Sequence, residues 1–206
     1  MVNLACIVEG DGDVDAVPIA IRRIVQSIDP GLILKIHPLR VPRTKLVKPG
    51  ELERSIELAA RRAGKDGAIF VILDSDDDCP ATLGPKLLGR ARKVRSDLPI
   101  SVVLAKREFE GWFLASAESL RGLRGLASDL APPSDPESIR GTKEWLTARM
   151  VTGRSYVETL DQPALAASFD LRQARMAPSF DKLFRDVAAI VDGFAVRQPP
   201  GLDSLR

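Results

Sequence analysis

Apolar and polar positions alternate along the first half of the chain in a way that predicts strands and helices in turn. Short apolar runs bounded by turn residues predict four buried strands, over residues 4–8, 32–41, 68–73 and 100–105. Between these runs, apolar residues recur at helical spacing over residues 14–28, 52–63 and 87–94. The alternation predicts an α/β fold, in which helices cover both faces of a parallel sheet.

Beyond residue 105 the pattern is helical only. The segment 106–113 leads into a predicted helix that carries Phe109, Trp112 and Phe113, and we expect Trp112 and Phe113 in the core. Residues 128–138 are rich in Pro, Asp and Ser and predict a surface loop, and helical spacing returns over 143–150 and 180–191. We therefore expect an α/β domain over residues 1–127 and, packed on it, a helical extension over 128–206, with a loose tail from residue 197.

Composition narrows the class of protein. The 206 residues are 45% hydrophobic and 28% charged, as in an ordinary globular protein. Neither a membrane-spanning run nor a secretion signal is apparent, so we expect a cytoplasmic protein. One histidine and two cysteines argue against zinc sites and histidine-based nucleases, and Cys6, inside the first apolar run, is expected to be a buried thiol. A net charge of +2 permits a nucleic-acid partner.

Acidic residues follow two of the predicted strands. Glu9 and Asp13 follow the first, and Asp74 and Asp76 follow the third, with Asp77 and Asp78 in the same loop. Carboxyl ends of parallel strands share one edge, and converging carboxylates attract a divalent cation. If the backbone stays extended through Asp76, its side chain points the same way as that of Asp74. The pattern predicts a magnesium-type site; the alternative is a solvated loop that caps the next helix.

Glu108 and Glu110 repeat this pattern after the fourth apolar run. They would hold a second metal ion, or else Glu108 is a first-turn helix residue favoured by the helix dipole. Both interpretations stay open from the residues alone. Two basic segments, residues 40–48 and 86–95, either bind a nucleic-acid backbone or are solvated faces.

The order of these motifs carries a resemblance. A strand ending in Glu9-Gly10, a crossover and a strand ending in Asp74-Ser75-Asp76 is similar to the Toprim domain of topoisomerases, primases and related nucleases. Asp13 and the late Glu-x-Glu look more like the overcoming-lysogenization-defect nucleases of that group. The whole chain resembles an uncharacterised Toprim-like family of small bacterial proteins, whose later motifs look like residues 106–113 and 178–183.

The resemblance implies a Toprim-like sheet and a metal-dependent nuclease that acts on DNA or other nucleic acid, as an effector in bacterial defence. It implies one or two Mg²⁺ or Mn²⁺ ions, with these metal ligands: Glu9, Asp13, Asp74, Asp76, Asp78, Glu108 and Glu110. Glu9 would also be catalytic, and Lys106 and Lys182 are candidates for a lysine that neutralises the transition-state phosphate. Proteins of this group often act with a separate ATPase, and no phosphate-binding loop is present in this sequence.

Three alternatives compete with the nuclease hypothesis. The first keeps the fold but not the catalysis, as a regulatory or binding subunit of an ATPase complex. A phosphoacceptor receiver domain would need an adjacent acidic pair after the first strand, where this chain has Glu9-Gly10. A haloacid-dehalogenase-type phosphatase would need its Asp-x-Asp after the first strand rather than the third.

Overall fold

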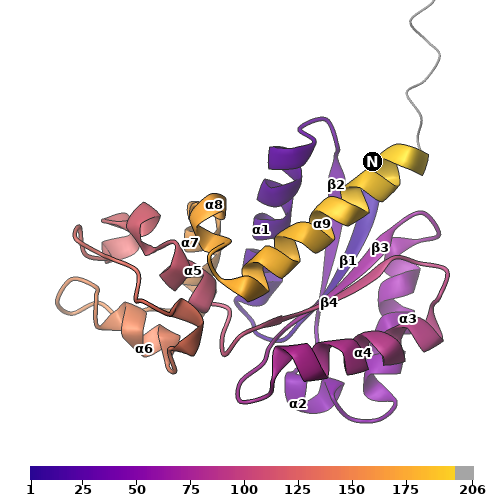
Figure 1. Ribbon diagram of the computed structural model, residues 1–206, viewed down its shortest axis with the longest axis horizontal. Helices are drawn as coiled ribbons and strands as arrows, with labels where there is room; N and C mark the ends of the chain where they lie inside the picture. Colours follow the sequence, from indigo (N-terminus) through magenta and orange to yellow (C-terminus); the bar gives the residue numbers. More distant parts are fainter. Residues whose placement is uncertain (198–206) are drawn as a thin grey trace, which may run out of the picture.

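The computed structural model describes residues 1–197 and contains a parallel four-stranded sheet (Figure 1). The strands follow the order β2-β1-β3-β4, with bounds β1 Val2–Val8, β2 Leu34–Arg40, β3 Ala68–Asp74 and β4 Ile100–Ala105. All four predicted strands are confirmed, with small shifts at their ends. The tail expected from residue 197 falls, from residue 198 on, outside the described residues; Arg197 itself is the last residue of a helix.

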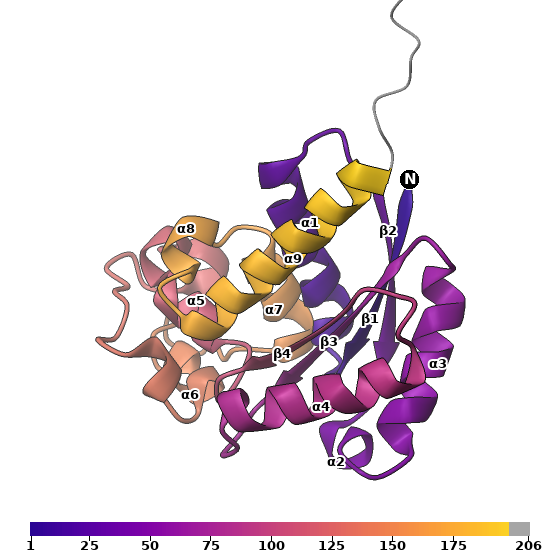
Figure 2. The same ribbon diagram turned by 45° about the vertical axis from the view of Figure 1, so that its right-hand side comes forward.

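Helices cover both faces of the sheet, as expected (Figures 1 and 2). One face carries α1, Asp13–Ile28, and the long carboxy-terminal helix α9, Pro178–Arg197. The other carries α3, Glu51–Ala63, and α4, Pro80–Val94, while the short α2, Arg43–Leu46, precedes α3. The protein is therefore an α/β fold in which the crossovers pass to both sides of the sheet.

The central strand β3 shows why its sequence is apolar without alternation. Phe70 and Ile72 face the core beneath α1 and α9, while Ile69, Val71 and Leu73 face the core beneath α3 and α4. All five are at most 2% exposed. Burying each such side chain stabilises the fold by roughly 1.5–3 kcal/mol, so a strand covered on both faces selects apolar residues at every position.

Apart from α9, the helical extension lies beyond the carboxyl ends of the strands (Figures 1 and 2). After α5, Gly111–Ala115, it contains α6, Thr142–Thr147, α7, Glu158–Ala166, and α8, Leu171–Ala174. Helix α7 packs against α1, and α9 packs on the edge strand β4. The sheet has one apolar core on each face, and the extension packs into the core on the face covered by α1 and α9.

Aromatic side chains hold the extension to the sheet. Five buried rings interlock, with neighbouring centroids 4.5 to 5.6 Å apart, and they are Phe109, Trp112, Phe113, Phe169 and Phe180. The expected core positions of Trp112 and Phe113 are confirmed, as is the buried thiol of Cys6. Phe109 is also buried, but it precedes α5 instead of lying on it as predicted, because the helix begins only at Gly111.

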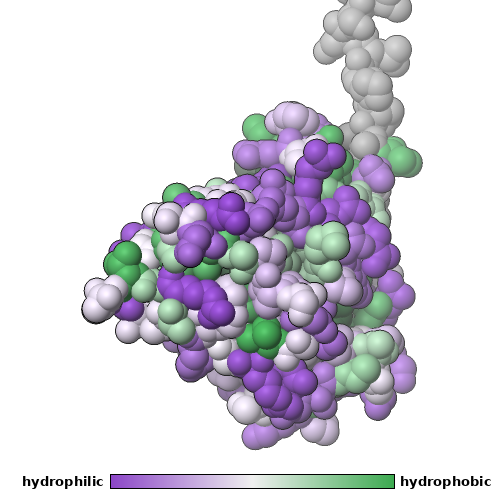
Figure 3. Space-filling view, turned by 60° about the vertical axis from the view of Figure 1, so that its left-hand side comes forward, coloured by the Kyte–Doolittle hydropathy of each residue, from purple (hydrophilic) through white to green (hydrophobic). Residues whose placement is uncertain are grey.

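The surface of the extension is mixed. In Figure 3, hydrophobic residues on this face form separate spots within a mainly hydrophilic surface. Within residues 1–197 no helix combines the length and the apolar character needed to cross a membrane.

Candidate functional site at the carboxyl ends of the strands

The candidate site lies where the chain changes direction across the sheet. Strands β1 and β3 are neighbours, with Val8 opposite Ile72. The chain leaves β1 for α1 on one face and reaches β3 from α3 on the other. Such a reversal opens a crevice at the carboxyl ends of the two strands. Glu9 follows β1 directly and Asp74 ends β3, so both carboxylates lie at this crevice.

The turn after β1 is glycine-rich because α7 packs closely on it. A Cβ atom on Gly12 would lie 2.2 Å from Gln162 Oε1 and 3.0 Å from the backbone oxygen of Glu158. A Cβ atom on Gly10 would lie 2.7 Å from Glu158 Oε1. The Gly12 N–H also donates a hydrogen bond to Glu158 Oε1 at 3.3 Å. The extension therefore forms one wall of the site.

Asp13 is buried between this turn and α7. Its carboxylate accepts hydrogen bonds from the Gly10 N–H at 2.8 Å and from Gln162 Nε2 at 3.0 Å. Burial raises the pKa of Asp13, while these two hydrogen bonds oppose the increase. Asp13 is 7% exposed, and the close hydrogen bonds fix its orientation.

The expected extension of the backbone through Asp76 is wrong. Strand β3 ends at Asp74, and Asp76 has a φ of +48°, so the chain turns sharply there. Asp74 accepts a hydrogen bond from the Phe109 N–H at 2.8 Å, whereas Asp76 pairs with Arg43 at 3.1 Å. The carboxylates of Asp74 and Asp76 therefore have different partners, because the turn separates their directions.

The rest of the acidic loop is exposed and paired with arginines. Asp78 contacts the same Arg43 as Asp76. Asp77 accepts from Arg107 and Arg140, each at 2.6 Å. The hydrogen bond and charge of Arg140, together with Arg107, lower the pKa of Asp77.

The carboxylates behind this loop influence one another. Burial raises the pKa of Asp74 well above its usual range, and the nearby charges of Glu110, Asp13 and Glu9 raise it further. Burial and the neighbouring Asp76 raise the pKa of Glu9, against the lowering effect of Arg43. Oxygen Oε2 of Glu9 is buried and has no hydrogen-bond partner. The structure thus brings Glu9, Asp13, Asp74 and Glu110 together, with Asp76 beside Glu9.

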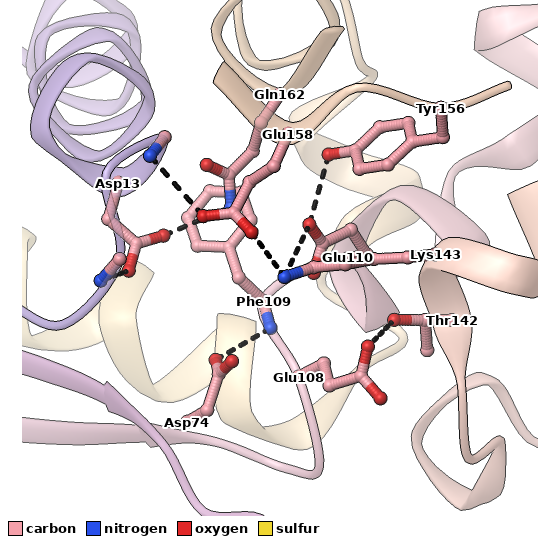
Figure 4. Close-up of polar contacts among 12 residues, drawn as sticks. Asp13, Asp74, Glu108, Phe109, Glu110, Thr142, Lys143, Tyr156, Glu158 and Gln162 are labelled. Carbon is pink, nitrogen blue, oxygen red and sulfur yellow. Dashed lines mark hydrogen bonds and ion pairs between the residues drawn. The ribbon is translucent and has the colours of Figure 1, made fainter. Parts of the chain in front are cut away.

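Glu110 is fully buried and belongs to a network contributed by the extension (Figure 4). Tyr156 donates its hydroxyl hydrogen to Glu110 Oε1 at 3.0 Å, and the Lys143 ammonium lies 4.0 Å from the same oxygen. Lys143 also donates to Glu158 at 2.5 Å. Burial raises the pKa of Glu110 to about 7, although Lys143 and Tyr156 oppose the increase. Its Oε2 atom is buried without a partner.

Lys143 is the cation at the centre of Figure 4. Burial alone would lower its pKa, but the charges of Glu110 and Glu158 outweigh burial and raise the pKa above its usual value. Burial alone would raise the pKa of Glu158, but the hydrogen bond and charge of Lys143, together with the Gly12 N–H and Arg40, lower it. Lys143 therefore stays charged between two carboxylates.

Glu108 turns away from this cluster. It accepts hydrogen bonds from the Gly141 N–H at 3.1 Å and from the Thr142 hydroxyl at 2.6 Å, at the start of α6. Helix α5 begins only at Gly111, so Glu108 is not in its first turn. The interpretation of Glu108 as a first-turn helix residue is therefore wrong. Glu108 instead accepts hydrogen bonds at the amino terminus of α6.

The two predicted lysines lie on another side of the acidic loop. Lys106 is exposed, and Lys182 is half-exposed and pairs with Asp186 at 2.5 Å. Both line a cavity next to Asp76–Asp78 rather than the crevice between β1 and β3. The structure therefore does not place them with Asp74 and Glu110.

Four polar residues of the site were not predicted from the sequence, namely Lys143, Tyr156, Glu158 and Gln162. A weak signal exists for two of them: Lys143 follows Gly141-Thr142 at the start of a predicted helix, and Tyr156 is the only tyrosine of the chain. Within residues 1–197, no three Asp, Glu, His or Cys side chains are grouped to hold a metal ion as they stand.

Comparison with known proteins gives a family but no characterised relative. No curated protein and no solved structure matches the chain. A family model described as "Domain of unknown function (DUF4276)" matches residues 8–188. That segment includes Glu9, the acidic loop, Lys143 and most of α9. The chain belongs to this DUF4276 family.

Proposed function

We propose that this protein is a metal-dependent nuclease that hydrolyses phosphodiester bonds in nucleic acid. The observation that carries the proposal is the convergence of four acids from three strand ends, whose pKa values are all raised: the buried Asp13 and Glu110 and the partly buried Glu9 and Asp74. Clustered carboxylates with perturbed pKa values in a crevice are typical of functional sites. The order of the acidic motifs, which resembles Toprim nucleases, points to the same chemistry.

The donor atoms suit Mg²⁺ or Mn²⁺, because both ions prefer oxygen ligands. Glu9 and Glu110 each keep one buried oxygen without a hydrogen-bond partner, and these two residues with Asp74 would hold an ion after side-chain rotation. When bound, such an ion lowers the pKa of a coordinated water and stabilises negative charge on a phosphoryl group. Asp76 and Asp13 are the adjacent acids available to a second ion.

The protein's own residues supply the remaining functions. Lys143 is held in place by Glu158 and Glu110 and stays protonated, so it can neutralise developing charge on the phosphate. Glu9, whose pKa is raised and whose Oε2 has no hydrogen-bond partner, is the acid to which we assign the acceptance of a proton from water. We therefore assign the phosphate-stabilising role to Lys143 in place of Lys106 and Lys182.

A cleavage assay tests this function. Purified protein would be incubated with supercoiled, linear and single-stranded DNA and with RNA, in Mg²⁺ or Mn²⁺ and in EDTA. We expect metal-dependent cleavage by the wild type and a loss of about 10³-fold in Asp74→Asn, as when a main stabilising group is removed. Asp66→Asn is the matched control, since Asp66 is exposed and lies before the amino-terminal end of β3, away from the cluster. Absence of cleavage of every substrate, also with a candidate partner ATPase, would refute the proposal.

A second candidate is a binding subunit without catalysis. Lys143 favours it, because this lysine already gives the acids a cation from within the protein. The two candidates differ in their response to Mn²⁺: a metal enzyme should show a higher melting temperature with millimolar Mn²⁺, and Asp74→Asn should lose that increase. A binding subunit should melt at the same temperature with and without the ion.

A further inference from the structure

A cavity next to the acidic loop is not used by the site described above. It has a volume of about 680 Å³ and lies between the start of α4, the end of β4 and the start of α9. Its size falls within the range of about 300–1,000 Å³ that is usual for small-molecule sites. Leu88, Val102 and Leu104 contribute apolar surface. Because β4 is the edge strand of the sheet, no further strand covers this side.

Cationic side chains surround this apolar surface, namely Lys106, Arg107, Lys182 and Arg185. Of the acids that line the cavity, Asp77 is paired with Arg107, while Asp76 and Asp78 are paired with Arg43. Lys106 is exposed and forms no ion pair within the described residues. The cavity thus offers an unpaired positive charge beside an apolar wall.

Ser179 adds a polar group at the start of α9. Its hydroxyl oxygen accepts hydrogen bonds from Trp112 Nε1 at 2.8 Å and from the Lys106 N–H at 3.3 Å. With those two hydrogen bonds made to the oxygen, the hydroxyl hydrogen remains available to a ligand. The fourth acid of the lining, Glu137, is engaged by the Ser179 N–H at 2.9 Å.

The cavity continues along the edge of the sheet. A second hollow of about 340 Å³ shares Leu88, Val102 and Lys182 with it and extends past Arg92 to Phe194. The groove runs from Asp76 along β4, and its lining combines apolar residues with both basic and acidic side chains. Its length and the unpaired Lys106 at one end fit a chain of nucleotides better than one isolated small molecule.

We propose that the cavity is a nucleotide-binding subsite, which holds the base and sugar of the nucleotide adjacent to the cleaved bond and places its phosphate near Lys106. The inference rests on the proposed nuclease function, because it is the cluster behind Asp76 that would act on the neighbouring phosphate. The apolar wall contacts the base, Lys106 attracts the phosphate, and Ser179 donates to a sugar or phosphate oxygen.

A pair of glycines in α4 allows a direct test. Gly84 lines the cavity, and a Cβ atom there would meet no atom within 4 Å, so the side chain of Gly84→Leu can grow into the cavity. Gly89 lies on the same helix, is exposed, and likewise has open space around a Cβ atom. Gly89→Leu is therefore the matched control. Both variants replace a helix-interior glycine, so both should melt at or above the wild-type temperature.

Binding would be measured in EDTA, with a fluorescein-labelled ten-nucleotide oligothymidylate and with thymidine 5′-monophosphate. We expect Gly84→Leu to weaken oligonucleotide binding at least about tenfold and Gly89→Leu to leave it unchanged. Lys106→Glu, an exposed change that spares the core, should weaken binding and reduce its dependence on salt.

The outcomes separate the subsite from the nuclease function. Wild-type affinity in Gly84→Leu, or no oligonucleotide binding by the wild type, would overturn the subsite. If Gly84→Leu loses oligonucleotide binding and the wild type cleaves no nucleic acid in Mg²⁺ or Mn²⁺, the subsite is kept and the nuclease function is refuted. If Gly84→Leu melts below the wild-type temperature, the test of the subsite depends on Lys106→Glu. Unchanged oligonucleotide binding by Lys106→Glu then rejects the subsite.

Discussion

Asp74 and Asp77 are three residues apart, yet their carboxyl groups lie in opposite environments. Burial and nearby acids raise the pKa of Asp74 well above its usual range. Arg140 and Arg107 lower the pKa of the exposed Asp77. The difference arises because the chain turns at Asp76 and carries the loop out of the crevice. Neighbouring acids in one motif can therefore behave differently: the raised pKa of Asp74 favours its protonated form, whereas the lowered pKa of Asp77 keeps this carboxylate charged in its ion pairs with arginines.

The exposed loop and the buried cluster also differ in the cationic side chains that lie near their acids. The exposed loop is surrounded by three arginines, Arg43, Arg107 and Arg140. The buried cluster has Lys143, which reaches it from the extension. Exposed ion pairs contribute about 0–1 kcal/mol each, whereas an incompletely neutralised buried cluster is a place to bind a cation. The comparison therefore favours the cluster rather than the loop as the place for the proposed metal site.

The largest expected effect concerns the cation of the buried cluster. Lys143→Met should slow metal-dependent cleavage by about 10²–10³-fold, because it removes a charge directed at the transition-state phosphate. Lys65→Met, which alters an exposed lysine before the amino-terminal end of β3, should change the rate by less than about threefold. Single-turnover rates at saturating substrate measure both. Equal losses in the two variants would contradict the role of Lys143.

The next largest effect is the pH dependence of the free energy of unfolding that the buried Glu110 causes. Glu110 has a pKa of about 7 in the folded protein against an ordinary value of 4.5, so between these pH values the folded state binds a proton that the unfolded state has lost. Stability therefore falls as pH rises through this window, by about 3 kcal/mol for this one group. Glu110→Gln should lack that decrease.

Urea unfolding in EDTA at pH 5 and pH 8 would compare the wild type with Glu110→Gln. The difference between the two proteins isolates Glu110 from the other acids whose pKa values are raised. If both proteins lose the same free energy of unfolding between these pH values, Glu110 does not titrate as the structure implies.

A smaller effect is expected where the glycine-rich turn after β1 contacts α7 of the extension. In Gly12→Ala the new methyl group would overlap Gln162 Oε1, at 2.2 Å, and approach the Glu158 backbone oxygen at 3.0 Å. Helix α7 must shift, which should lower the free energy of unfolding by about 1–3 kcal/mol. Gly89→Ala, at an open helical position, should instead stabilise the protein slightly, and urea titration measures both changes.

The smallest effect belongs to the exposed loop. Asp77→Asn should leave the urea midpoint of unfolding essentially unchanged, since salt-screened surface pairs contribute little. A loss of stability as large as that of Gly12→Ala would show that the loop is a structural support of the cluster, and the division between the two regions would fail.

The sequence was sufficient for the sheet and its covering helices because apolar periodicity directly reflects burial. It also placed Glu9 and Asp74 at one edge, since parallel strands share their carboxyl ends. It could not place Glu108, whose direction depends on a turn and on contacts with Gly141 and Thr142. Nor could it find Gln162, which meets Asp13 across 149 residues. Periodicity carries no information about such distant side-chain contacts.

The contact between Gly12 and Glu158 spans 146 residues, and this separation has a consequence for how the protein matures. All four strands are synthesised before α7, so the sheet emerges from the ribosome without the wall that contains Glu158 and Gln162. Contacts between distant segments also form late, because closing a long loop costs chain entropy. In a partly synthesised chain, the carboxyl groups of the cluster therefore remain hydrated, with pKa values in their usual range. The raised pKa values arise only when the last helices dock.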